Sequence, residues 1–340
     1  MQRALQLAEK GGVFVAPNPK VGAVIVHNDK IIGEGFHKKY GEAHAEVNAV
    51  ESVTNKDVLK EATIYVTLEP CSHFGKTPPC SDLIIKYQFK RVVVACIDTF
   101  SEVAGRGVER IRNAGIQVEV GVLEKEARFL NRRFFTYHEK NRPYIILKWA
   151  QTLDGFLDEE RGEGETGIHW ITQPETKCLV HKWRGEEQSI LVGVNTINTD
   201  DPLLNLRNYL IGKSPIRFVL DPDNSIKKET KVLSDNQATI VFNQRKNHNL
   251  PAHTTQFSLL EFSLSNILKE IHKQGISSIF VEGGRYTHEH FLTANLWDET
   301  RVLVGTTKFQ QGLKAPLFTK SPNEVRKFGK DEVRITYNEI

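Results

Sequence analysis

The stretches HAEVNAV (residues 44–50) and TLEPCSHFGKTPPC (residues 67–80) decide the fold of the first half of this 340-residue chain. They provide the imidazole of His44 and the thiols of Cys71 and Cys80. One histidine and two cysteine thiolates suit Zn²⁺, and three protein ligands leave the fourth tetrahedral position open to water. A structural site is usually closed by a fourth protein ligand, so the sequence predicts a catalytic zinc site.

Glu46 follows the histidine by two positions. A carboxylate is a poor addition to a thiol-rich zinc shell, but here it can take a proton from water and deliver it to a leaving amine. An H-x-E sequence followed by Pro-Cys and a second cysteine is the signature of zinc-dependent nucleobase deaminases. The residues therefore predict hydrolytic deamination with Glu46 as proton shuttle. A structural zinc knot, or ordinary buried residues, would leave the glutamate spacing unexplained.

The loop between Cys71 and Cys80 contains eight residues, whereas the general signature has two. This longer loop can still return Cys80 to the metal, and it places His73 and Lys76 beside the pocket. Cationic and polar groups of this kind suit an anionic substrate such as a phosphate ester. Asn18 lies in a rigid Pro-Asn-Pro loop, where its amide could read the edge of a base or only shape the turn.

Composition limits the classes of function. The length exceeds that of a usual single core and permits two domains, while a net charge of +3 is too small to indicate a nucleic-acid partner. The first residues lack a signal core and no apolar run could span a bilayer, so we expect a cytoplasmic enzyme without a membrane partner. Cys96 and Cys178 are expected to be buried, reduced thiols.

Short apolar runs alternate with helical patterns along the first half, which predicts a sheet layered with helices. Two expected helices, Ala43–Val53 and Cys80–Tyr87, open at the predicted zinc ligands. Leu123–Lys140 is expected to form one charged helix. The expected strands are Val21–Val26, Ile31–Phe36, Ile64–Leu68, Arg91–Ile97 and Ile116–Val120.

A second α/β domain is expected to begin near Asn141-Arg142-Pro143. Glu282-Gly283-Gly284 lies between an expected strand and an expected helix, where backbone amides could hold a phosphate. No G-x-G-x-x-G fingerprint supports a Rossmann domain. The expected strands are Tyr144–Ala150, Ser189–Val194, Ile216–Leu220, Ala238–Phe242, Ser277–Val281 and Thr300–Val304, and the expected helices are Pro174–Arg184, Leu264–Gln274 and Tyr286–Asn295.

Taken together, the motifs closely resemble those of the bifunctional riboflavin-biosynthesis deaminase/reductases. The deaminase half of that family is matched by PNPKVG at 17–22, HAE at 44–46, TLEPCSH at 67–73 and KTPPC at 76–80. Its reductase half is matched by KWA at 148–150, LDG at 153–155, WIT at 170–172, LVG at 191–193, TDDPLLNLR at 199–207 and EGG at 282–284.

The resemblance implies an α/β architecture with a cytidine-deaminase-like three-layer domain at residues 1–141 and a dihydrofolate-reductase-like domain at residues 142–340. It implies zinc-dependent deamination of 2,5-diamino-6-(5-phosphoribosylamino)pyrimidin-4(3H)-one. NADPH-dependent reduction of the ribosyl group would then give 5-amino-6-(5-phosphoribitylamino)uracil. We expect one Zn²⁺ per chain, NADPH, a small phosphorylated pyrimidine substrate and a homo-oligomer.

The resemblance also implies site residues. His44, Cys71 and Cys80 would bind the metal, Glu46 would move protons, and Asn18, His73 and Lys76 would contact the deaminase substrate. The residues implied for the NADPH site are Ala150, Trp170, Thr172, Thr196, Asp200, Gly283 and Gly284. Those implied for the reductase substrate are Arg184, Leu204, Arg207 and Glu282.

Reduction also requires a proton at the ring oxygen, for which Asp200 and Lys148 are the candidate donors. Arg184 and Arg207 are candidates for bidentate binding of the substrate phosphate. Gln188 replaces a frequent Asp of the family, and residues 162–169 lack its usual Ser/Lys pattern. A deaminase whose second half is inactive or differently specific therefore stays open, beside a nucleic-acid or nucleoside deaminase and a nonenzymatic nucleotide-sensing module.

Overall fold

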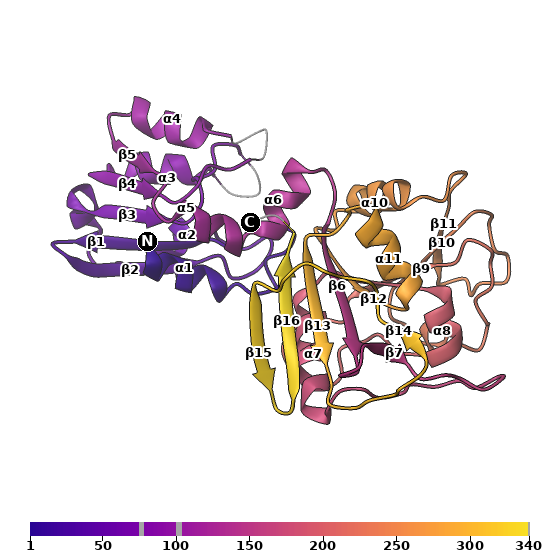
Figure 1. The fold of residues 1–340 in the computed structure, drawn as a ribbon. Coiled ribbons are helices and arrows are strands. Elements are labelled where there is room, and N and C mark those ends of the chain that lie inside the picture. The colour runs from indigo at the N-terminus through magenta and orange to yellow at the C-terminus, as the bar shows by residue number, and fades with distance from the viewer. Residues whose placement is uncertain (75–77, 100–103, 339–340) are drawn as a thin grey trace. The chain divides into compact units, whose positions relative to one another are not determined.

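The computed structural model describes residues 1–74, 78–99 and 104–338. The chain divides between Asn141 and Arg142 into two units (Figure 1). Among the described residues, none of the helices combines the length and apolar character that crossing a membrane requires.

The first unit is built on a five-stranded sheet in the order β2-β1-β3-β4-β5. β1 is antiparallel to β2 and β3, whereas β3, β4 and β5 are parallel. All five strands expected in this half are therefore confirmed. Their bounds are β1 Gly22–His27, β2 Lys30–Phe36, β3 Thr63–Val66, β4 Arg91–Val94 and β5 Gln117–Val120.

Helices pack on both faces of this sheet (Figure 1). Ile25 packs in the cluster that contains α2, whereas the adjacent Val24 packs with α1, because neighbouring strand residues face opposite sides. At Gly35 a Cβ would lie 2.3 Å from the Ala49 nitrogen, so only glycine lets α2 approach β2 this closely. The helices are α1 Gln2–Glu9, α2 Ala45–Glu51, α3 Cys80–Lys86, α4 Arg106–Asn113, α5 Glu124–Leu130 and α6 Arg132–Glu139, with a 3₁₀ helix, η1, at Lys56–Glu61.

The single helix expected at Leu123–Lys140 is wrong, because the segment forms two helices, α5 and α6. Asn131 lies between them. Its side chain accepts a hydrogen bond from the Lys20 backbone N–H at 2.8 Å and donates one to the Lys20 carbonyl at 2.9 Å. The break thus coincides with an asparagine whose amide pairs with a distant backbone segment, a contact that helical periodicity does not reveal.

The second unit is built on a nine-stranded sheet in the order β11-β10-β9-β8-β12-β6-β13-β16-β15. The first seven strands in this order, β11, β10, β9, β8, β12, β6 and β13, run parallel to one another. β16 is antiparallel to both β13 and β15. The strands are β6 Tyr144–Gln151, β8 Ser189–Gly193, β9 Ile216–Leu220, β10 Thr239–Asn243, β11 Thr255–Ser258, β12 Ser278–Glu282, β13 Glu299–Val304, β15 Glu324–Phe328 and β16 Asp331–Tyr337, and a separate pair is formed by β7 Phe156–Asp158 and β14 Leu313–Lys314.

Sequence reasoning found the central strands and missed β11, β15 and β16 of this sheet, together with the separate pair β7 and β14. The central strands are buried on both faces: Ile146 packs in one core cluster and its neighbour Ile145 in the other. The edge strands β11 and β15 are polar and largely exposed, so they carry no apolar run. The helices are α7 Pro174–Glu186, α8 Val194–Asp200, α9 Lys231–Ser234, α10 Leu264–Lys273 and α11 Arg285–Thr293.

The two cysteines outside the predicted zinc site differ in burial. Cys96 is buried, as expected, but Cys178 is exposed, so that expectation is wrong. Cys178 lies on α7, whose buried residues include Thr176, Val180 and His181. The thiol therefore falls on the solvent side of a helix whose other faces are covered.

Candidate active sites

His44, Cys71 and Cys80 converge in the first unit. His44 is the residue before α2, and Cys80 is the first residue of α3. The Nδ1 atom of His44 lies 3.6 Å from the Cys71 sulfur and 3.3 Å from the Cys80 sulfur, and the three ligand atoms lie within 4.8 Å of one another. One nitrogen and two sulfurs at these separations fit around a single Zn²⁺ with bonds of about 2.0–2.3 Å.

The sulfur of Cys71 is prepared for metal binding. It faces the Cys80 thiol and accepts a hydrogen bond from the Cys80 backbone N–H at 3.3 Å. The hydrogen bond from the Cys80 thiol, followed by that from the His44 ring, lowers the pKa of Cys71. A thiolate is the form that ligates zinc, so the donor set fits this ion chemically as well as geometrically.

Glu46 lies in the first turn of α2 and is 3% exposed. Burial, and then the charge of Cys71, raise the pKa of its carboxyl to about 7. A hydrogen bond also joins this side chain to Cys80. A carboxyl with a pKa near neutrality can both accept and release a proton, as a shuttle must.

Asn18 is tied to the metal site through His37, which sequence reasoning missed. The Asn18 amide nitrogen lies 3.2 Å from His37 Nε2, and His37 Nδ1 lies 3.1 Å from the carbonyl oxygen of Ala43. Burial lowers the pKa of His37, so the ring is neutral and Nδ1 donates to Ala43. A histidine seven positions before His44, at the end of an expected strand, was the only signal available.

Two more residues, His73 and Lys76, were implied for the deaminase substrate. His73 is exposed in the loop between the cysteines. Lys76 lies outside the described residues.

Glu69, two positions before Cys71, is a further residue without a predicted role. Its carboxylate accepts backbone hydrogen bonds from Asp98, Gly105, Gly107 and Val108 at 2.8–3.2 Å. At Gly107 a Cβ would lie 1.9 Å from the Pro70 carbonyl oxygen, so the start of α4 packs directly on the Glu69–Cys71 segment. Glu69 thus fixes the backbone that presents a zinc ligand.

In the second unit, the residues predicted for the reductase meet at one cavity of about 840 Å³. They come from β6, α7, α8, the β12–α11 turn and the irregular segments between them. The lining includes Lys148, Ala150, Trp170, Thr172, Arg184, Thr196, Asp200, Leu204, Arg207, Glu282, Gly283 and Gly284. The expected strand, turn and helix around Gly283-Gly284 are present, because β12 ends at Glu282 and α11 begins at Arg285.

A buried ion cluster lies in this cavity. The Nε and Nη2 atoms of Arg184 donate to the two Glu282 oxygens at 2.7 and 2.8 Å, and Lys148 Nζ lies 3.5 Å from the same carboxylate. Against the opposing effect of burial, these two cations lower the pKa of Glu282 to about 2. Burial lowers the pKa of Lys148. Glu282 occupies the Nε–Nη2 edge of the Arg184 guanidinium, so phosphate binding by Arg184 is limited to its other edge and stays a prediction.

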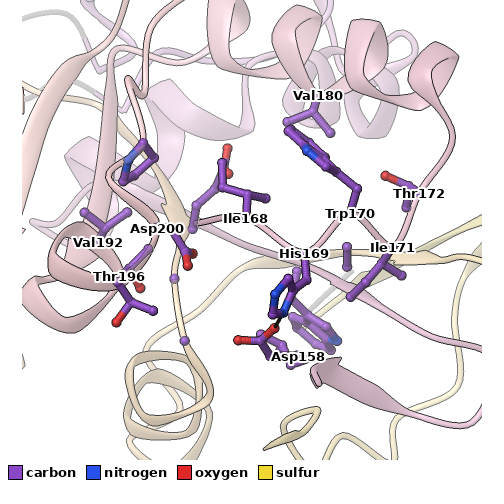
Figure 2. A pocket seen from close by; sticks show the side chains of 18 of the residues that line it. Asp158, Ile168, His169, Trp170, Ile171, Thr172, Val180, Val192, Thr196 and Asp200 are labelled. Carbon is purple, nitrogen blue, oxygen red and sulfur yellow. Dashed lines mark hydrogen bonds and ion pairs between the residues drawn. The ribbon is translucent and has the colours of Figure 1, made fainter. Parts of the chain in front are cut away.

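Asp200 meets a different partner, Arg161, whose Nη2 lies 3.1 Å from its carboxylate. Burial raises the pKa of Asp200 to about 6, although Arg161 opposes the shift. Figure 2 shows Asp200 and Thr196 on one side of the cavity and Trp170 with Thr172 on the other. Arg161 directly precedes residues 162–169, the stretch that departs from the family pattern, and sequence reasoning gave it no role.

Two further features of the cavity concern aromatic and ionic groups. Trp170 is 52% exposed, and Lys177 Nζ stands 3.2 Å from its ring centroid. His169 Nδ1 lies 2.8 Å from Asp158, which also pairs with Arg161 at 2.5 Å (Figure 2). An exposed indole beside polar groups is a suitable surface for a flat heterocycle.

Two family models match the chain. The model described as "Cytidine and deoxycytidylate deaminase zinc-binding region" matches residues 1–96, and the one described as "RibD C-terminal domain" matches residues 143–324. Among curated proteins, the "Riboflavin biosynthesis protein RibD" of Aquifex aeolicus is 46% identical over 318 residues, covering 92% of this chain and 88% of the relative. The protein of the same name from Escherichia coli is 36% identical and covers 89% and 86%.

Solved structures give the same result. RibD of Acinetobacter baumannii superposes with a TM-score of 0.89 at 34% identity, covering 99% of this chain and 97% of that one. A Thermotoga maritima protein described as a diaminohydroxyphosphoribosylaminopyrimidine deaminase/5-amino-6-(5-phosphoribosylamino)uracil reductase superposes with a TM-score of 0.88 at 37% identity, with the same coverage. The similarity therefore spans both units.

Proposed function

Because this chain belongs to the RibD family of riboflavin-biosynthesis proteins, we propose that it deaminates 2,5-diamino-6-(5-phosphoribosylamino)pyrimidin-4(3H)-one and then reduces the ribosyl group with NADPH. The chain is a bifunctional enzyme, with a cytidine-deaminase-like unit and a dihydrofolate-reductase-like unit, and the predicted fold class is confirmed. The substrate, NADPH and the role of each residue are the proposal.

The observation that carries the proposal is the presence of both sets of groups in one chain. The first unit brings a zinc donor set together with a buried carboxyl whose pKa is about 7. The second unit brings the reductase residues around one cavity. This set of residues favours an active reductase over the alternative of a deaminase whose second half has diverged.

Deamination assigns the proton transfers to Glu46. Zn²⁺, when bound by His44, Cys71 and Cys80, would supply the Lewis acidity that makes water nucleophilic at neutral pH. Glu46 takes one proton from the attacking water and passes it to the 2-amino group, which leaves as ammonia. The second water proton moves to the adjacent ring nitrogen as the ring carbon becomes a carbonyl. Asn18, held by His37, is positioned to bind an edge of the pyrimidine.

Reduction assigns phosphate binding and proton donation to the cavity. NADPH, when bound, would supply the hydride for the ring-opened ribosyl carbon. The whole lining holds as many carboxylates as cations, but around Glu282 the three cations Lys148, Arg184 and Arg207 exceed its single negative charge, so this part of the cavity favours a phosphorylated substrate. Asp200 and Lys148 are the candidate donors to the ring oxygen, because burial moves the pKa of each toward neutrality.

The proposal is tested by giving the purified, zinc-loaded protein the diaminopyrimidine ribosylamine phosphate and following ammonia and NADPH in one vessel. NADPH oxidation that depends on ammonia release supports both steps. Ammonia release without NADPH oxidation would favour a diverged second half. The absence of both signals would refute the proposal. Parallel assays with NADH and metal analysis of the isolated protein test the two cofactors, and light scattering tests the expected homo-oligomer.

A further inference from the structure

One polar ring in the reductase cavity has no role in the assignments above. His181 lies on α7, one helical turn before Arg184, and is 3% exposed while still lining the cavity. Its Nδ1 atom accepts a hydrogen bond from the backbone N–H of Arg207 at 3.4 Å. A second hydrogen bond joins the ring to the backbone of Asn205. Both contacts are to the segment that carries Arg207.

The hydrogen bonding requires an uncharged ring. Because Nδ1 accepts a proton donor, the ring's own proton lies on Nε2. Burial, followed by the charges of Arg184 and Arg207, lowers the pKa of His181 to about 4. A neutral imidazole adds no charge that could attract a phosphate. Any effect of His181 on phosphate binding must therefore come from its hydrogen bonds to the backbone of the Asn205–Arg207 segment.

The segment that it holds has no helix or strand of its own. Leu204 adopts a positive φ of 49° although it is buried, and Arg207 Nη1 donates to the Asn205 side chain at 2.9 Å. Gly185, one turn after His181 on the same face of α7, also packs here: a Cβ at Gly185 would lie 3.1 Å from a Leu206 methyl carbon. Helix α7 therefore contacts this turn at two positions that lie one helical turn apart, His181 and Gly185.

We propose that His181 is a positioning residue of the reductase, which holds the Asn205–Arg207 turn on α7 so that the Arg207 guanidinium is set for the substrate phosphate. The inference rests on the proposed function, in which Arg207 binds that phosphate. It extends the site to a residue that makes no contact of its own with the substrate.

The first test compares His181→Phe with His181→Asn. Phenylalanine keeps a ring of similar size and removes both hydrogen bonds, whereas an asparagine oxygen can replace Nδ1 as acceptor. For 5-amino-6-(5-phosphoribosylamino)uracil we expect His181→Phe to raise KM about tenfold with kcat changed less than about twofold, and His181→Asn to restore most of the loss. His248→Phe, an exposed histidine of the same unit outside the cavity lining, is the matched control. An unchanged KM in His181→Phe overturns the proposal.

A double-mutant cycle tests whether the effect passes through Arg207. Arg207→Ala alone should raise KM, and adding His181→Phe should raise it no further, because the positioned group is already gone. Fully additive effects would mean that His181 acts on the substrate independently, which contradicts a positioning role.

Limited trypsin digestion tests, without any substrate, whether His181 keeps the Asn205–Arg207 turn packed on α7. Cleavage of the native protein after Arg207, followed by mass spectrometry, should be faster in His181→Phe than in wild type and close to wild type in His181→Asn. Unchanged cleavage in His181→Phe overturns the proposal. If cleavage accelerates but Arg207→Ala leaves KM unchanged, the hold is supported and the phosphate role that the proposed function gives Arg207 is wrong.

Discussion

Arg184 and Glu282, 98 positions apart in the chain, face each other through two hydrogen bonds of 2.7 and 2.8 Å in the reductase cavity. Their side chains are only 11% and 12% exposed. The pair therefore makes the Nε–Nη2 edge of Arg184 unavailable to a substrate. Of the two arginines expected to bind the phosphate, Arg207 is the one whose guanidinium is not hydrogen-bonded to Glu282. The pair also makes Glu282 the counter-charge for Arg184 and Lys148.

Replacing Glu282 should destabilise the second unit. Glu282→Gln leaves two buried cations without a counter-charge, and we expect a loss of about 3–5 kcal/mol in the free energy of unfolding. Denaturant unfolding measures it. Glu186→Gln, which removes an exposed pair with Lys182 at 3.9 Å, is the control and should change little. Equal effects of the two substitutions would contradict the role given to Glu282.

The same pair should make stability depend on pH. The pKa of Glu282 is about 2 in the folded protein, below its value of about 4.3 in an unfolded chain. Its contribution is thus present above about pH 4.3 and lost as pH falls toward 2. The stability difference between wild type and Glu282→Gln should shrink over that window. A difference that grows on acidification would show that the sign is wrong.

Glu46→Gln should separate the two activities. An amide cannot shuttle the proton, so we expect ammonia release to fall by about 10²–10⁴-fold while zinc content is kept. Reduction of separately supplied 5-amino-6-(5-phosphoribosylamino)uracil should be unchanged. Glu51→Gln, an exposed change on the same helix, is the control. Loss of both activities in a folded Glu46→Gln protein would show that the two halves do not work independently.

Metal removal should also act on one half. A chelator should abolish ammonia release, since His44, Cys71 and Cys80 form the only group of metal-ligating side chains found among residues 1–74, 78–99 and 104–338. NADPH oxidation with the deaminated substrate should persist, and added Zn²⁺ should restore ammonia release. If chelation stops only NADPH oxidation, the metal assignment is wrong.

Asp200→Asn should have the opposite selectivity. If Asp200 supplies the proton or orients NADPH, its loss should lower kcat/KM of the reductase by about 10²-fold or more and spare zinc binding and ammonia release. Asp201→Asn, at the adjacent and more exposed carboxylate that pairs with Lys231, provides the matched comparison. Loss of deamination without unfolding would contradict the assignment.

Glu69→Gln should weaken the backbone that presents Cys71. The amide offers one acceptor oxygen to four backbone N–H groups, so we expect about 2–3 kcal/mol of destabilisation in the first unit. A lower affinity for zinc should accompany it, because Cys71 is two residues away. Chelator competition and thermal unfolding measure the two effects, and an unchanged zinc affinity would restrict Glu69 to stability alone.

The sequence by itself determined the chemistry that depends on residue type and short spacing. A metal site and a proton shuttle were predicted from His44, Glu46, Cys71 and Cys80. The apolar runs predicted every strand of the first sheet and the buried central strands of the second. These features are local, because side-chain chemistry and strand periodicity are both written within a few consecutive residues.

Only the tertiary structure decided which polar groups face each other. The pairing of β12 with β6 sets Glu282 beside Lys148, and helix α7 brings Arg184 to the same carboxylate. Similar long-range contacts join Asn18 to His37 and Asp200 to Arg161. Polar side chains carry no periodic signal that names a partner. Their pairing is fixed by sheet order and helix packing, which also determine whether burial moves a pKa toward the value that catalysis needs.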